Sequence, residues 1–158
     1  MQDYSAFKDV MAICRDAEQG YRSAANAVRT PALRDLFEEN SAQRGGFARE
    51  LHRLARSMGM HIDDPSGLAG ALIGGWIELK GILSRHNERQ ILIEVARGEA
   101  QSVKTYRQTL AMNLSSEVRT LIESQSAQVQ QARDRIVSLR DSTARKQEPT
   151  GQQGGVTL

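Results

Sequence analysis

The sequence has 158 residues, of which 39% are hydrophobic, 4% aromatic and 25% charged, and its formal net charge is +2. A chain of this length is most simply one domain that can bury its own core. The low aromatic share favours an all-α protein over a β-sandwich or barrel. The arginines are spread along the chain rather than gathered in a basic stripe, which argues against nucleic-acid binding.

Cysteine content and hydropathy indicate the compartment. Cys14 is the single cysteine, so an internal disulfide is excluded, as is typical of a reducing environment. No charged-then-apolar leader opens the sequence, and no apolar run approaches the ~20 residues that span a bilayer. We therefore expect a cytoplasmic protein that makes no membrane contact, with Cys14 as a small core residue.

The first predicted helix covers residues 4–28. Its core positions follow a seven-residue repeat of Phe7, Cys14, Tyr21 and Val28. Glu18 lies at the edge of this apolar seam, one turn before Tyr21.

The second predicted helix covers residues 31–58, where Thr30 is placed to cap it and Pro31 suits its first position. The inward face is apolar at both ends, but Asn40 and Gln43 interrupt its middle and Glu39 flanks them. Solvation of an exposed face does not explain this pattern, so we expect these residues to have polar partners inside the protein.

A break at residues 59–66 separates the second helix from a glycine-rich connecting segment. Asp64-Pro65-Ser66 is a helix-start signal, and leucines recur near one face of the stretch that follows. The segment is therefore predicted to be a connecting helix. Trp76, the only tryptophan, is interpreted as its packing anchor.

The third predicted helix covers residues 88–112, and Asn87 with Gln90 forms a capping box at its start. Its inward positions are Leu92, Val95, Glu99, Ser102, Tyr106 and Leu110. Glu99 is thus a carboxylate within an apolar stripe. A buried carboxylate without a partner costs several kcal/mol or takes up a proton, so another helix is expected to bring it a partner.

The fourth predicted helix runs from about residue 115 to 142, and Gln125 interrupts its apolar face. We therefore expect a bundle domain over residues 1–142. The polar, Gly- and Gln-rich residues 143–158 are predicted to be a flexible tail. The alternative for this tail is a peptide that docks on a partner.

Counting ~1.5 Å per residue from the turns places the polar interruptions of all four helices near the middle of the bundle. About 28 residues separate the second and third long helices. This is long enough for those helices to run parallel, which predicts the single-crossover topology of ferritin-like bundles with a helical crossover.

The sequence resembles a family of uncharacterised proteobacterial ferritin-like four-helix-bundle proteins, with rubrerythrin and bacterioferritin as remote cousins. The resemblance covers residues 5–142 and depends on the stretches AEQGYRSAA, LFEENSAQRGGFARELHRL, SGLAGALIGGWIELK, ARGEAQSVKTYRQTL and SSEVRTLIESQ. It implies the ferritin-like fold but supplies no function, because the family has no established one.

The resemblance suggests a metal site, for which this sequence has only part of the ligand set. Ferritin-like di-iron proteins use a Glu from each of two helices and Glu-x-x-His from each of the other two. Glu18 and Glu99 match the first pair, but no Glu-x-x-His occurs, and none of the three histidines has the right spacing. The candidate metal residues at the matching level are Glu18, Glu39, Gln43, Glu99 and Gln125.

The favoured interpretation of these residues is a hydrogen-bonded network that fixes helix register, in which Glu18 and Glu99 repel each other and share a proton. The sequence therefore predicts a non-catalytic binding or structural protein that has no cofactor and forms a homodimer. Its resemblance to rubrerythrin and bacterioferritin implies a stress-related role. The alternative is a di-iron or manganese oxidoreductase or peroxidase resembling rubrerythrin. Glutamine oxygens are poor substitutes for carboxylate and imidazole at iron.

Overall fold

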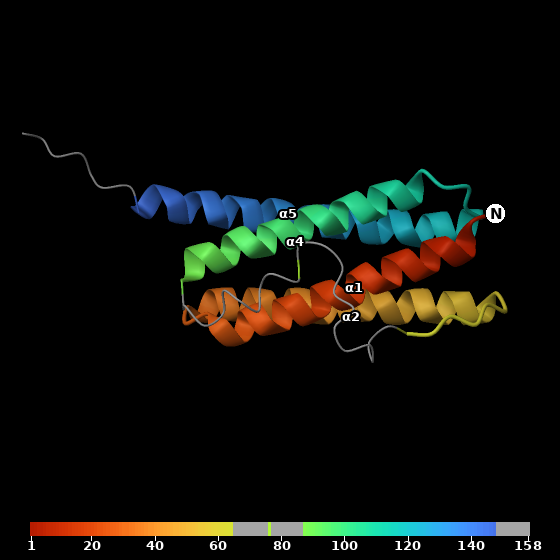
Figure 1. Cartoon of the computed structure of the whole chain (residues 1–158), viewed down its shortest axis with the longest axis horizontal. Helices are drawn as coiled ribbons and strands as arrows, with labels where there is room; N and C mark the ends of the chain where they lie inside the picture. The colour runs from red at the N-terminus through yellow and green to blue at the C-terminus, as the bar shows by residue number, and fades with distance from the viewer. Residues whose placement is uncertain (65–75, 77–86, 148–158) are drawn as a thin grey trace, which may run out of the picture.

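The computed structural model describes residues 1–64, 76 and 87–147, and its regular elements in these ranges are helices (Figure 1). The long helices are α1 (Asp3–Ala27), α2 (Pro31–Ser57), α4 (Glu88–Leu110) and α5 (Ser116–Gln147). The prediction of an all-α four-helix bundle is confirmed for the described residues. Apart from Trp76, the predicted connecting helix lies outside them. None of the described helices is long and apolar enough to cross a membrane.

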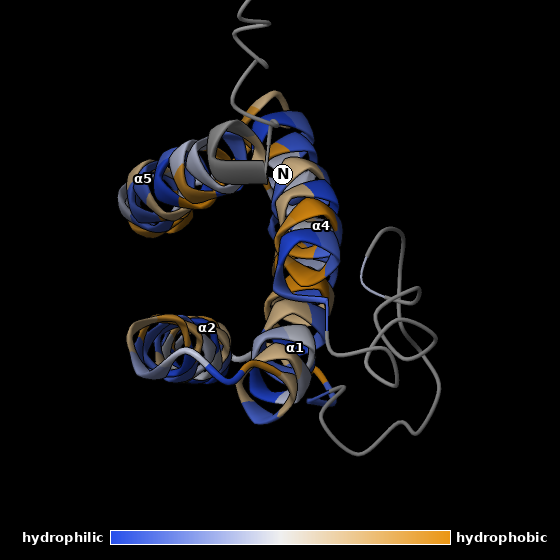
Figure 2. Cartoon of the chain, turned by 90° about the vertical axis from the view of Figure 1, so that its left-hand side faces the viewer, coloured by the Kyte–Doolittle hydropathy of each residue, from blue (hydrophilic) through white to orange (hydrophobic). Residues whose placement is uncertain are grey.

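The helices follow the order expected for a chain with one long connection. Figure 1 shows α1 and α2 running in opposite directions, α4 running in the same direction as α2, and α5 returning. α1 packs against both α2 and α4, and α4 packs against α5, whereas α2 and α5 touch at few points. Viewed along the bundle axis, the ribbons of α2 and α5 stand farther apart than those of the other neighbouring helices (Figure 2). The ferritin-like assignment itself stays a prediction.

Side-chain hydrogen bonds join the helix ends to neighbouring turns. Asn87 caps α4 as predicted, accepting a hydrogen bond from the Gln90 amide at 3.2 Å. The predicted Thr30 cap is wrong, because its side chain makes no capping bond. Instead, Glu88 accepts hydrogen bonds from the Thr30 amide and hydroxyl at 2.8 and 2.7 Å and from the Arg29 amide at 2.8 Å. This ties the α1–α2 turn to the start of α4.

Trp76 is buried against α1 and α4, which confirms its predicted role as a packing anchor. Its ring lies so close to Gly20 and Gly98 that a Cβ at these positions would come within 2.2 and 2.4 Å of it. Its indole nitrogen donates to the Ser102 hydroxyl at 3.4 Å, and its ring centroid lies 5.1 Å from that of Tyr21. The two glycines therefore make room on the helix surfaces for the aromatic ring.

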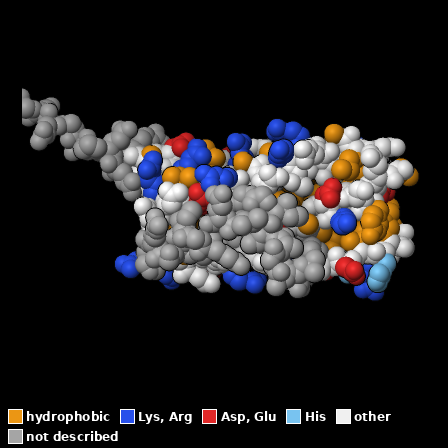
Figure 3. All heavy atoms as spheres, in the orientation of Figure 1, with side chains coloured by type: hydrophobic (Ala, Val, Ile, Leu, Met, Phe, Trp, Pro, Cys, Tyr) orange, Lys and Arg blue, Asp and Glu red, His pale blue; other side chains and the backbone are white. Residues whose placement is uncertain are grey.

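The last helix is longer than predicted. α5 continues to Gln147, five residues past its predicted end at 142. Most of the predicted tail, residues 148–158, lies outside the described residues. In Figure 3, lysine and arginine side chains occur along both the upper and the lower edge of the visible face, in keeping with their even spread in the sequence.

Candidate functional site

An ion pair between Arg44 of α2 and Glu99 of α4 occupies the middle of the bundle. Nη1 and Nη2 of Arg44 donate to Oε1 and Oε2 of Glu99 at 2.7 and 2.8 Å. The two side chains are 1% and 0% exposed. The sequence predicted that Glu99 is buried and has a partner on another helix, and both points are confirmed. The parallel, two-pronged geometry is the strongest that a guanidinium and a carboxylate can form.

The position of Arg44 follows from the periodicity of α2. Asn40, Arg44, Ala48, Leu51 and Ala55 recur every three or four residues and are all buried. They lie on one face of the helix, which turns Arg44 into the bundle. Arg44 was not among the predicted site residues, because an arginine is rarely buried unless it is paired. The signal that could have found it was the partner required by Glu99, together with a cation one turn after Asn40.

The surroundings of Arg44 keep it charged. Burial opposes its charge, but the facing carboxylate of Glu99 outweighs burial, so the pKa of Arg44 is held above its usual value. Its Nε donates to the Gln43 side-chain oxygen at 3.3 Å. The guanidinium carbon lies 5.6 Å from the centre of the Tyr21 ring, which adds a cation–π contact.

Tyr21 and Asn40 extend the polar layer beside the ion pair. The hydroxyl of Tyr21 and Nδ2 of Asn40 are both buried, and neither meets hydrogen-bond geometry with another described atom. Burial first, and then the negative charge of Glu99, raise the pKa of Tyr21 well above its ordinary value. Tyr21 therefore stays a neutral phenol next to the pair.

A hydrogen-bonded chain connects all four described helices, and its Tyr106 lies about two helical turns beyond Glu99 on α4. The Tyr106 hydroxyl of α4 donates to the Gln125 side-chain oxygen of α5 at 2.9 Å. Because this uses the only proton of the hydroxyl, the Cys14 thiol of α1, at 3.1 Å, donates to the Tyr106 oxygen. Gln125 Nε2 in turn donates to the Phe47 carbonyl of α2 at 3.3 Å. Burial raises the pKa of Cys14 to about 11, so its thiol stays protonated and unreactive.

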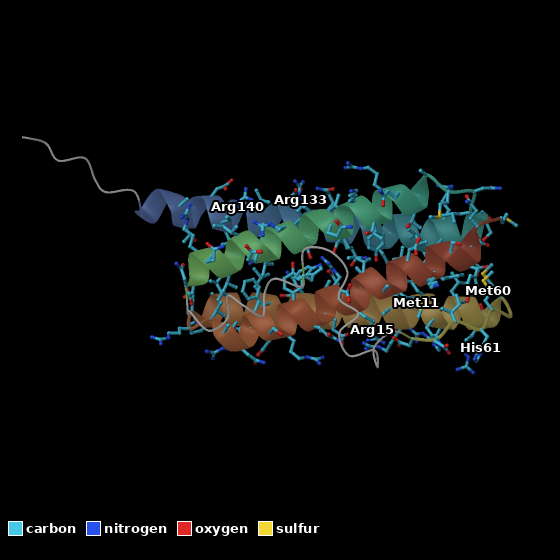
Figure 4. All side chains as sticks on the ribbon, in the orientation of Figure 1. Met11, Arg15, Met60, His61, Arg133 and Arg140 are labelled. Atoms are coloured by element: carbon cyan, nitrogen blue, oxygen red, sulfur yellow. The ribbon has the colours of Figure 1, made fainter. Side chains whose placement is uncertain are left out.

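Glu18 belongs to a separate cluster at the surface. Its oxygens accept from Arg15 at 2.7 Å and from the exposed Arg22 at 3.4 Å. Arg15, labelled in Figure 4, also holds Asp64 with two hydrogen bonds of 2.9 and 2.6 Å. The predicted repulsion between Glu18 and Glu99 is therefore wrong, because each carboxylate has its own arginine.

The five predicted site residues are brought together only in part. Glu99 and Gln125 are buried, Gln43 is partly buried next to Arg44, and Glu18 is 15% exposed. Glu18 still lies at the level of the ion pair, since a Cβ on Gly45 would come within 2.7 Å of it. Glu39 is exposed, so the prediction that it belongs to the interior layer is wrong.

Whether these residues bind a metal stays a prediction. Within residues 1–64, 76 and 87–147, no group of three or more His, Cys, Asp or Glu side chains is arranged to hold a metal ion. Both oxygens of the Glu99 carboxylate already face the guanidinium of Arg44. A cation would therefore compete with a fixed positive charge for this carboxylate.

Comparison with known proteins gives a family but no activity. The model of the family described as "Domain of unknown function (DUF2383)" matches residues 2–112, which include Arg44 and Glu99. No curated protein matches the sequence.

Proposed function

Because the chain belongs to the DUF2383 family, whose function is unknown, we propose that it is a non-catalytic binding or structural protein whose bundle is held by the Arg44–Glu99 pair instead of a metal centre. The observation that carries this proposal is the two-pronged ion pair between side chains that are 1% and 0% exposed. We also propose that it works as a homodimer. The stress-related role implied by its resemblance to rubrerythrin stays a prediction.

The proposal rests on the charge balance of the layer. In ferritin-like di-metal bundles, several carboxylates and two histidines meet and cations balance their charge. Here the charge of Glu99 is balanced by Arg44. The side chains of Gln125, Tyr106 and Cys14 nearby are neutral. A bound dication would add positive charge to a site that already has a cation, at a large cost in a buried environment.

The role that the pair supports is the pairing of helices. α2 and α4 belong to the two halves of the bundle, which otherwise meet mainly where α1 packs on α4. A buried, directional pair is satisfied in one register only, so it selects that register against alternatives. Such a layer supplies a fixed scaffold for binding and needs no reacting group.

Metal analysis of the purified full-length protein tests the proposal. Cells are grown with added iron or manganese, and metal per chain is measured for wild type, Glu99→Ala and Arg44→Gln. We expect wild type and Glu99→Ala to hold equally little metal. The di-metal oxidoreductase predicts about two metals per wild-type chain, lost in Glu99→Ala. That second result would overturn the proposal, whereas uptake only by Arg44→Gln would support it, because that variant removes the competing cation.

A further inference from the structure

Two hollows lie end to end between α2 and α5. The larger has a volume of about 560 Å³ and includes Leu54 of α2 and Leu121 of α5. The smaller, of about 180 Å³, is lined mostly by polar groups such as Gln43 and Gln128. Together they form a groove along α2 and α5, which touch at few points. We call this feature, lined by the residues of either hollow, the α2/α5 groove.

Four exposed charges mark the ends of the α2/α5 groove. Glu39 of α2 and Arg135 of α5 line the smaller hollow, and Arg53 of α2 and Glu117 of α5 line the larger one. In the part of the chain that the structure describes, none of these four side chains has an ion pair or a hydrogen bond. The smaller hollow therefore presents Glu39 and Arg135 on opposite walls. The larger hollow presents Arg53 opposite Glu117, with the half-buried Glu50 also on its α2 wall.

This arrangement of charge is complementary to itself. The midpoint of Glu39 and Arg53 along α2 is residue 46, and that of Glu117 and Arg135 along α5 is residue 126. The bond from Gln125 Nε2 to the Phe47 carbonyl places these midpoints at one level. A second copy, related by a twofold axis that runs across the groove in the plane of the interface, is turned end for end. It brings Glu39 opposite Arg53 of the partner subunit.

The same turn brings Glu117 opposite Arg135 of the partner subunit. A copy turned about an axis along the groove instead brings Glu39 opposite Arg135 of the partner subunit, and Arg53 opposite Glu117 of the partner subunit. Both twofold arrangements pair every one of the four charges with an opposite charge. Complementary potentials of this kind fix the register and orientation of an interface.

We propose that the α2/α5 groove is the interface of a twofold homodimer, with Glu39, Arg53, Glu117 and Arg135 as its intersubunit ion pairs. The half-buried Leu54 and Leu121 in the larger hollow supply apolar contact towards one end of the groove. A twofold interface uses the same patch on both subunits, and a self-complementary patch meets that requirement. This inference rests on the proposed homodimer and is independent of the role assigned to Arg44 and Glu99.

Sedimentation velocity of the full-length chain over a wide concentration range tests the proposal. We expect wild type to dimerise and Glu39→Arg to weaken association at least about tenfold, because it places like charges together at both symmetry-related positions. The matched control is Glu38→Arg, since Glu38 is also exposed but lines a hollow between α1 and α2. This control is expected to associate as wild type does. Circular dichroism checks that each variant is folded.

Charge swaps identify the arrangement. Glu39→Arg with Arg53→Glu restores the dimer if the copies are turned end for end, and Glu39→Arg with Arg135→Glu restores it if the axis follows the groove. Restoration by either swap supports the proposal. A wild type that stays monomeric, equal effects of Glu38→Arg and Glu39→Arg, or failure of both swaps would overturn it. Metal content is a separate measurement, so this failure is distinguishable from failure of the metal-free scaffold.

Discussion

Replacing Glu99 with glutamine tests the ion pair while keeping the size and shape of the side chain. At an effective dielectric constant of about 20, opposite charges about 4 Å apart attract by roughly 4 kcal/mol. The variant loses this attraction, but Arg44 stays buried and charged. A hydrogen bond from Arg44 to the Gln oxygen returns about 1 kcal/mol. We therefore expect Glu99→Gln to lower the free energy of unfolding by about 3 kcal/mol, in line with other broken buried pairs.

Urea unfolding followed by circular dichroism measures this change, and thermal unfolding should show a Tm lower by about 6–12 °C. The matched control is Asp141→Asn, which removes a carboxylate charge from the exposed pair with Arg140, where the Asp141 side chain is 56% exposed. It should change stability by less than about 1 kcal/mol, because exposed pairs contribute little.

A double variant separates the pair from its partners. Arg44→Met with Glu99→Leu removes both charges, so it should be much more stable than the sum of the two single effects implies. If Glu99→Gln is instead as stable as wild type or more stable, then burying the charge of Arg44 does not require the carboxylate of Glu99. That result would refute a stabilising role for the ion pair.

Three further results are expected. Burial raises the pKa of Cys14 from 9.0 to about 11. The contribution of this thiol to stability is therefore complete below pH 9 and is lost as pH rises towards 11, by roughly 2–3 kcal/mol. Cys14→Ala should remove that part of the loss of stability at alkaline pH, as measured by urea unfolding. Gly98→Ala should destabilise the protein and shift Trp76 fluorescence to longer wavelength, because its Cβ would come within 2.4 Å of the indole, whereas Gly46→Ala, with its nearest neighbouring atom at 3.8 Å, should gain up to about 1 kcal/mol from helix propensity. Tyr106→Phe should cost about 1–3 kcal/mol in urea unfolding, because it leaves the Gln125 oxygen without its donor.

The fold was predictable because it depends on local patterns. The apolar periodicity and the turn residues Thr30-Pro31 and Asn87 placed all four helix starts within one residue of those observed. The length of the connection predicted the parallel course of α2 and α4, which Figure 1 shows. The last helix extends beyond its predicted end because residues 143–147 include no proline or glycine to stop it, whereas the apolar pattern used to predict the end stops earlier.

The site was predictable only in part because its chemistry depends on contacts between helices. Counting residues along each helix gives the height of a polar side chain, which is why Glu99 and Gln125 were found. Neighbouring residues of a helix point in directions about 100° apart, and counting does not tell which of the two faces inward. Gln43 was therefore placed inward and Arg44 was overlooked. For the same reason Glu18 was paired with Glu99, although Arg15 lies one turn before it.

We propose that a guanidinium, and not a metal ion, neutralises Glu99 inside the bundle. Anomalous X-ray diffraction from crystals grown with manganese is the decisive measurement. We expect Arg44 nitrogens within about 3 Å of both Glu99 oxygens and no anomalous peak beside Glu99. An anomalous peak bound by Glu99, with Arg44 displaced from it, would refute this proposal.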